Sequence, residues 1–99
     1  MAREVIWSWR AQNDKKAILA YWKNRNKSNS YSKKLNGLFR EAIRLIQEHP
    51  KVGRPTDDES VRVKIVRDYL VIYELSDTAI EILTIWDVRQ DPQKLKDII

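Results

Sequence analysis

The stretch from Val61 to Pro92 constrains the fold more than any other part of this chain. It contains three apolar runs, which are separated by two short polar breaks. In the first run apolar residues alternate with Arg62 and Lys64, and a period of two is typical of a half-buried strand. The second run is apolar at almost every position, as in a central strand. Breaks this short join antiparallel neighbours, so the sequence predicts a β-meander over Val61–Ile65, Tyr69–Leu75 and Ala79–Asp87.

An earlier strand is expected near the N-terminus, over Arg3–Ser8. Val5, Trp7 and Trp9 alternate there with other residues, which indicates that they share one face. Two tryptophans on one face bring a large apolar area. We therefore expect both in the core or at a covered edge, and we favour this strongly over a base-stacking platform.

Two helices are predicted between the first strand and the meander. Apolar residues recur at spacings of three and four from about Ala11 to Asn26 and from about Tyr31 to Glu48. The polar segment between them is short enough to be the turn of a helical hairpin. His49, the only histidine, is followed by Pro50 and is expected to cap the second helix rather than to catalyse.

The order of these elements restricts the topology of an α+β fold with a four-stranded antiparallel sheet. If every element reverses the chain, the last strand is the antiparallel neighbour of the first, and the spatial order of strands is 1-4-3-2. Both helices then cover one face. Arg62 and Lys64 lie on one side of their strand and are expected on the opposite, open face. The expected core includes Leu38, Phe39, Val71, Tyr73 and Ile82.

Composition limits the class of protein. The 99 residues suffice for one domain, residues 1–99, and the absence of cysteine excludes disulfides and Cys-based zinc sites. The acidic run Asp57–Glu59 lies in the predicted loop Lys51–Ser60, where consecutive acids do not converge on a metal. No signal peptide or membrane span is recognisable. We expect a cytoplasmic protein without metal, cofactor or membrane contact.

The charge balance favours an anionic partner. Nineteen Lys and Arg against fourteen Asp and Glu give a formal net charge of +5. Nucleic acid and an acidic protein both fit such a charge. A basic protein with no nucleic-acid role fits equally well, so charge alone leaves these alternatives open.

The chain as a whole resembles the RelE/ParE superfamily of bacterial toxins from type II toxin–antitoxin modules, which act in plasmid stabilisation and addiction. The resemblance covers nearly the whole sequence and rests on the order and spacing of several motifs. These are Ala11-x-x-Asp14 with Ile18 and Tyr21, then Tyr31, Leu35, Phe39, Ala42 and Leu45, then Pro50 and Gly53-Arg54-Pro55, then Val61-Arg62, Tyr69–Tyr73, Ile82–Ile85 and Arg89–Pro92.

This resemblance implies one of two activities. RelE-like members cut messenger RNA in the ribosomal A site without a metal, whereas ParE-like members poison DNA gyrase. RelE-like members tend to carry an arginine directly after the tyrosine of the third strand, where this chain has Leu70. Many members carry a histidine after the last strand, where this chain has Asp87. Both departures favour the gyrase poison over the nuclease, and whether the chain is an enzyme stays open here.

Five cationic residues form the expected target-binding surface: Arg54, Arg62, Lys64, Arg67 and Arg89. The alternative is a solvated strand face with sites for an acidic antitoxin tail. The resemblance implies a cognate antitoxin with an acidic amphipathic segment as one partner, and DNA gyrase or the ribosome with its messenger RNA as the other. A non-toxic basic module that binds nucleic acid is the remaining alternative.

Overall fold

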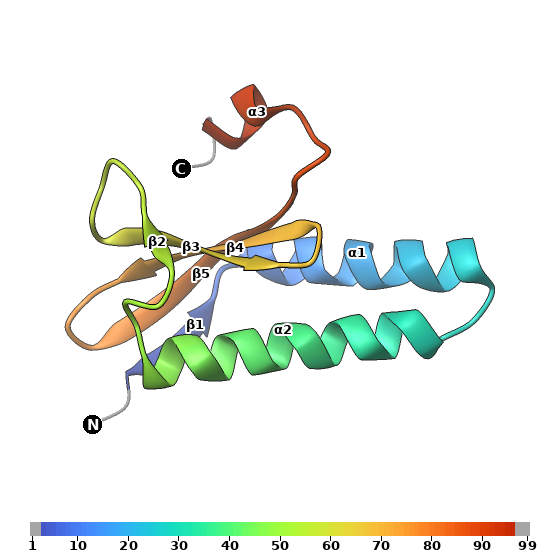
Figure 1. Cartoon of the computed structure of the whole chain (residues 1–99), viewed down its shortest axis with the longest axis horizontal. Coiled ribbons are helices and arrows are strands. Elements are labelled where there is room, and N and C mark those ends of the chain that lie inside the picture. Colours follow the sequence, from blue (N-terminus) through green and yellow to red (C-terminus); the bar gives the residue numbers. More distant parts are fainter. Residues whose placement is uncertain (1–2, 97–99) are drawn as a thin grey trace.

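The computed structural model describes residues 3–96. The described part of the chain forms a helical hairpin and a mixed sheet, followed by a short helix (Figure 1). In chain order the elements are β1 (Glu4–Trp7), α1 (Trp9–Asn26), α2 (Ser30–Glu48), β2 (Arg54–Pro55), β3 (Val61–Val66), β4 (Tyr69–Leu75), β5 (Ala79–Asp87) and α3 (Pro92–Lys96). The α+β class, both long helices and the meander are confirmed. The loop predicted over residues 51–60 also contains the short strand β2.

The sheet has the strand order β1-β5-β4-β3-β2. The predicted order of the four longer strands is therefore confirmed, with β2 added at the edge. The predicted direction of the first strand is wrong, because β1 runs parallel to β5 in a register that pairs Glu4 with Ala79 and Trp7 with Ile82. The sheet is therefore mixed, and only its other pairs are antiparallel.

The parallel pairing of β1 follows from the short connection to α1. Ser8 alone separates the two elements, and its side chain caps the helix by accepting a hydrogen bond of 3.0 Å from the N–H of Ala11. A single residue gives the chain no room to fold a helix back over the strand, so α1 leads onward from the end of β1 (Figure 1). The hairpin then returns the chain to the end at which β1 begins. The prediction wrongly assumed a reversal at every connection.

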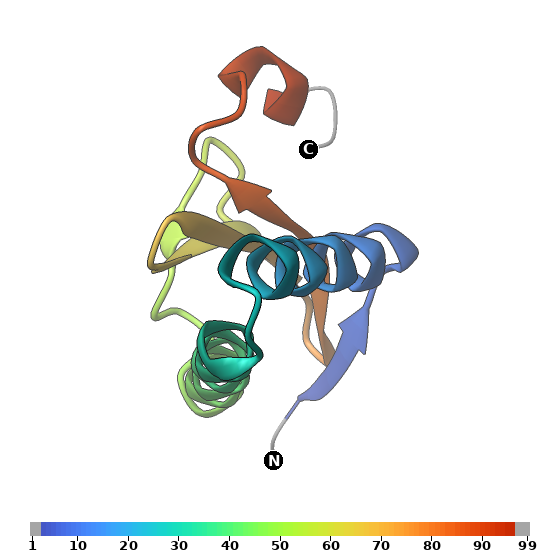
Figure 2. The same cartoon turned by 90° about the vertical axis from the view of Figure 1, so that its right-hand side faces the viewer.

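The core lies between the hairpin and one face of the sheet (Figure 2). Leu35, Phe39, Ala42 and Ile46 lie on one stripe of α2 and are all buried. Of the five predicted core residues, Leu38 is half-buried against the core and the other four are buried. The helix α1 buries only Ala11 fully and packs against β5 and α2 through half-buried side chains: Ile18, Leu19 and Trp22.

The opposite face of the sheet is less open than expected. Ile72 and Trp86 project from it, because each alternates with residues that face the hairpin, and both are buried. α3 follows β5 and lies on the side of the sheet away from α2 (Figures 1 and 2). None of the helices in the described part of the chain is long and apolar enough to cross a membrane.

Candidate functional site

A cleft of about 350 Å³ lies between α1 and the end of the sheet where β4 begins and β5 leaves. Asp14, Ile18 and Tyr21 line it from the helix, and Tyr69, Asp87 and Arg89 line it from the sheet. Two of these residues belong to the sequence argument on function, since Asp87 replaces the family histidine and Arg89 is a candidate for target binding. We call this hollow the α1 cleft.

Asp87 and Arg89 form a two-point ion pair in the α1 cleft. Nε of Arg89 donates to Oδ1 of Asp87 at 2.9 Å, and an Nη donates to Oδ2 at 2.7 Å. The backbone N–H of Arg89 also donates to Oδ1 at 2.9 Å. These hydrogen bonds hold the pKa of Asp87 below its usual value, although burial opposes them, and the carboxylate raises the pKa of Arg89. The guanidinium therefore already binds a carboxylate through the geometry with which it would bind a phosphate.

Tyr69, which lines the α1 cleft, is joined by a hydrogen bond to Trp22 of α1. The indole N–H of Trp22 donates to the hydroxyl oxygen of Tyr69 at 2.7 Å. The guanidinium of Arg89 lies 5.9 Å from the centre of the Trp22 ring. Burial raises the pKa of Tyr69, so its hydroxyl keeps its proton at neutral pH. The raised pKa disfavours the phenolate form that a general base would need.

Asp14 ties α1 to an irregularity in β5. The pairing register of β4 with β5 shifts between Ile72 and Tyr73, which leaves local groups outside the ladder. Oδ2 of Asp14 accepts hydrogen bonds from the hydroxyl of Thr84 and from the N–H of Ile85. Asp14 belongs to the family motif Ala11-x-x-Asp14, but nothing in the sequence indicates the β-bulge with which it pairs.

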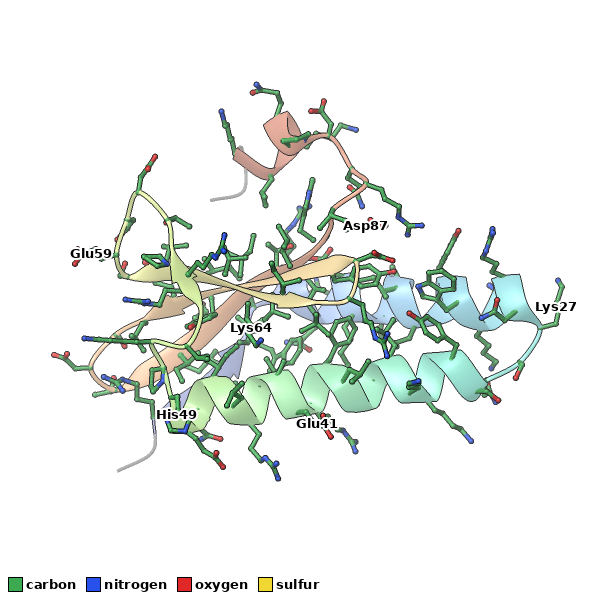
Figure 3. All side chains as sticks on the ribbon, viewed as in Figure 1. Lys27, Glu41, His49, Glu59, Lys64 and Asp87 are labelled. Carbon is green, nitrogen blue, oxygen red and sulfur yellow. The ribbon has the colours of Figure 1, made fainter. Side chains whose placement is uncertain are left out.

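The structure places Arg62 and Lys64 on the other face from the one predicted. The register sets Arg62 opposite Tyr73 and Lys64 opposite Val71, and both partners face the hairpin. Figure 3 shows Lys64 between the sheet and α2. The prediction assigned the face by elimination, without the register that decides it.

Arg62 supports the loop after α2. One Nη donates to the carbonyl oxygens of Gly53 at 2.9 Å and of Lys51 at 3.3 Å, while its buried Nε has no hydrogen-bond partner. The hydroxyl of Tyr73 strengthens the same loop by donating to the carbonyl oxygen of Pro50 at 2.6 Å and accepting from the N–H of Gly53 at 3.0 Å. Arg62 is therefore engaged in holding the backbone beside Arg54.

Lys64 and Arg67 line a groove of about 270 Å³ between β3 and α2, which we call the β3 groove. Leu38 and Leu45 line it from α2, and Ile65, which is 58% exposed, lines it from β3. Arg67 is exposed in the turn after β3, and its φ of 57° is left-handed.

The five predicted cations are therefore divided. Lys64 and Arg67 share the β3 groove, Arg54 is exposed on the neighbouring strand β2, and Arg62 holds the loop between them. Arg89 lines the α1 cleft instead.

His49 and the acidic loop residue Asp58 were also considered from the sequence, and both make local hydrogen bonds. His49 occupies the C-cap of α2, where its backbone N–H donates to the carbonyl oxygen of Leu45 at 2.8 Å. Asp58 accepts hydrogen bonds from the N–H and hydroxyl of Ser60, and these bonds lower its pKa. Over residues 3–96, no three His, Cys, Asp or Glu side chains are grouped so that they could hold a metal ion.

A helical hairpin packed on a mixed sheet is the α+β architecture that the resemblance to the RelE/ParE superfamily leads one to expect. The family described as "ParE toxin of type II toxin-antitoxin system, parDE" matches residues 5–92, so the chain belongs to this family. It is thus the toxin of a plasmid-stabilisation type of module, and family membership implies a cognate ParD antitoxin.

A solved structure supports the fold. The structure described as "Chromosomal ParDE TA system from P. aeruginosa" aligns with a TM-score of 0.75 and 19% sequence identity. The alignment covers 87% of this chain and 96% of that one. No curated protein sequence matches the chain significantly.

Proposed function

We propose that this ParE toxin inhibits growth by binding DNA gyrase and that it does not cut RNA. The ion pair between Asp87 and Arg89 is the observation that carries the second half of the proposal. Family membership supports the first half, because poisoning of gyrase is the activity that resemblance to ParE-like toxins implies.

RNA cleavage through a 2′-hydroxyl needs a base, a cation for the phosphorane charge and an acid for the leaving oxygen. In the α1 cleft the carboxylate of Asp87 already occupies two donor groups of Arg89. Tyr69 has a raised pKa and Leu70 offers no charge. A phosphate entering this cleft would have to displace Asp87 and would meet its negative charge, which favours a binding poison over a nuclease.

The target contact is proposed for the β3 groove and the strand beside it. Lys64 and Arg67 supply positive charge in the groove, and the exposed Ile65 supplies apolar area. Arg54 adds a charge on the neighbouring strand, where it pairs with Val63 and so projects from the face opposite Lys64. Interfaces combine a desolvated apolar centre with charged residues that steer association. Arg62 acts indirectly in this proposal, because it holds the carbonyl oxygen of Gly53 next to Arg54.

Induced expression tests the choice of target. Plasmid supercoiling and protein synthesis should be followed in parallel after induction. We expect supercoiling to change while synthesis continues. An immediate arrest of synthesis with unchanged supercoiling would favour RNA cleavage and overturn the proposal.

A double variant tests the proposed surface. Lys64→Ala removes one charge, and Arg67→Asn removes the other with a residue that tolerates left-handed φ. We expect the variant to need at least tenfold more inducer to stop growth, with little change in its melting temperature. Lys34→Ala, which changes an exposed lysine near the start of α2, is the control and should stay toxic. Full toxicity of the double variant would move the target surface elsewhere.

The antitoxin partner is proposed to present an acidic amphipathic segment. The toxin carries a net charge of +5, so long-range attraction should speed association with such a segment. The association rate should then fall as salt rises from about 0.05 to 0.5 M, because screening shortens the reach of the charges. An association rate independent of salt would contradict the acidic character of the segment.

A further inference from the structure

A second surface lies at the start of α1, away from both sites described above. It is a hollow of about 520 Å³ lined by Trp7, Trp9, Gln12, Asn13, Lys15 and Lys16, and we call it the tryptophan hollow. Trp9 is 76% exposed, and no other large hydrophobic side chain in the described residues is as exposed. The prediction that Trp9 lies in the core or at a covered edge is therefore wrong, and this side chain needs an explanation of another kind.

The connection at Ser8 creates the hollow. The cap at Ser8 starts the helix at Trp9, so this indole leaves the strand face that Trp7 occupies. Trp9, Gln12, Asn13 and Lys16 are spaced by three and four residues and form one exposed stripe of α1. Trp7 stays against the core at the floor, and the ammonium group of Lys15 lies 5.0 Å from the centre of its ring.

The lining has the chemistry of a peptide-binding site. The two indoles can enclose a bulky apolar side chain, and tryptophan is enriched among residues that dominate binding energy. Lys15 and Lys16 offer positive charge beside it, which selects acidic neighbours. The volume lies within the range of about 300–1,000 Å³ that is typical of ligand pockets.

Side chains rather than the strand backbone are available to a partner at this edge. The carbonyl oxygen of Trp7 accepts from Nε2 of Gln12 at 3.1 Å, and that of Arg3 accepts from Nε2 of Gln47 at 2.9 Å. These amides occupy two acceptors on the outer edge of β1, where an added strand would otherwise bond.

We propose that the tryptophan hollow binds an acidic segment of the cognate antitoxin, which inserts one large apolar side chain between Trp7 and Trp9. Family membership implies a cognate antitoxin, and the positively charged lining favours an acidic segment of it. A second copy of this chain would bring lysines against lysines. A nucleic-acid strand would find only two lysines in the lining, too few to track a backbone of several nucleotides. The proposal rests on the assignment as a toxin but not on gyrase as the target.

The test compares matched variants of the full chain. Trp9→Ala removes the anchor and Lys16→Glu reverses a charge; the controls are Val88→Ala, an exposed apolar residue after β5, and Lys27→Glu, at the far end of α1 (Figure 3). Each is expressed alone and with the antitoxin in a growth assay, and antitoxin is titrated against each purified toxin. Melting temperatures establish that every variant is folded.

We expect Trp9→Ala to weaken antitoxin binding about 30-fold, the loss that removal of an interface anchor causes. Lys16→Glu should slow association several-fold at low salt. Both variants should remain toxic alone and escape neutralisation, while the controls are neutralised normally. Unchanged antitoxin affinity in both variants would overturn the proposal, and so would loss of toxicity with the complex intact, because the hollow would then belong to the target. Neither result depends on which target the toxin poisons.

Discussion

Substitution of Asp14 should reveal how strongly α1 is tied to β5. Asp14→Ala leaves the hydroxyl of the fully buried Thr84 and the N–H of the buried Ile85 without their acceptor. Each buried donor left unpaired costs about 1–3 kcal/mol. The better helix propensity of alanine returns roughly 0.5 kcal/mol. The neighbouring ion pair with Arg10, 3.9 Å apart and half-exposed, contributes little. We therefore expect a net loss of about 2–4 kcal/mol in the free energy of unfolding.

Urea titration, followed by tryptophan fluorescence, measures this loss. Asp14→Asn keeps an acceptor oxygen and should cost only about 1–2 kcal/mol, because both hydrogen bonds persist as weaker neutral ones. In a Thr84→Val background, Asp14→Ala should cost at least about 1 kcal/mol less than in the natural chain, since no hydroxyl is left unpaired. A loss below about 1 kcal/mol for Asp14→Ala, or strict additivity of the two substitutions, would refute this account of the contact.

Three further predictions concern the core, the loop after α2 and the ion pair. Phe39→Ala should lower the free energy of unfolding by about 3–5 kcal/mol in urea titration, because the side chain is 1% exposed; a loss below about 1 kcal/mol would contradict its burial. Gly53→Ala should destabilise more in the natural chain than with Tyr73→Phe, because a Cβ at Gly53 would meet the Tyr73 hydroxyl at 2.6 Å; equal losses in thermal melts would show that this approach is unimportant. The pKa of Asp87 is lowered by Arg89, so the stability it contributes is present above about pH 4 and is lost as pH falls through the lowered value. Asp87→Asn should therefore flatten the acid side of a stability–pH curve, and an unchanged curve would argue against the pair.

The order of strands was predictable because it depends on short connections and apolar runs. Three runs with brief polar breaks can hardly form anything except a meander, and the structure contains it at nearly the predicted bounds. The direction of β1 depended instead on the single residue Ser8. The sequence shows that a serine can cap a helix, but the geometry of the linked strand and helix decides whether the chain turns back.

The sequence predicted which residues belong to the candidate site, but not the sheet face or the partner of each. Arg62 and Lys64 were correctly placed on one side of their strand, but pairing with Tyr73 and Val71 turned that side toward the hairpin. Arg89 was correctly placed beyond the last strand, but its pairing with Asp87 two residues earlier was not recognised. Alternation along a strand determines which residues share a face. The pairing register between strands determines whether that face points toward the hairpin or away from it.

The tryptophan hollow was hidden for a related reason. A period of two through Val5, Trp7 and Trp9 reads as one strand face until the helix start is known. Because α1 begins at Trp9, the pattern breaks after Trp7, and the two indoles separate into one at the floor and one in solvent. Periodicity across an element boundary therefore misplaced a side chain that is central to the proposed antitoxin contact.

The central claim is that this ParE toxin binds gyrase without acting as a nuclease, and a purified assay tests it most directly. Increasing toxin should be added to gyrase with relaxed plasmid and ATP, and in parallel to ribosomes carrying a defined messenger RNA. We expect dose-dependent inhibition of supercoiling, reversal by antitoxin, and intact messenger RNA. Normal supercoiling at saturating toxin, together with cleavage of the messenger RNA in the ribosomal A site, would contradict it.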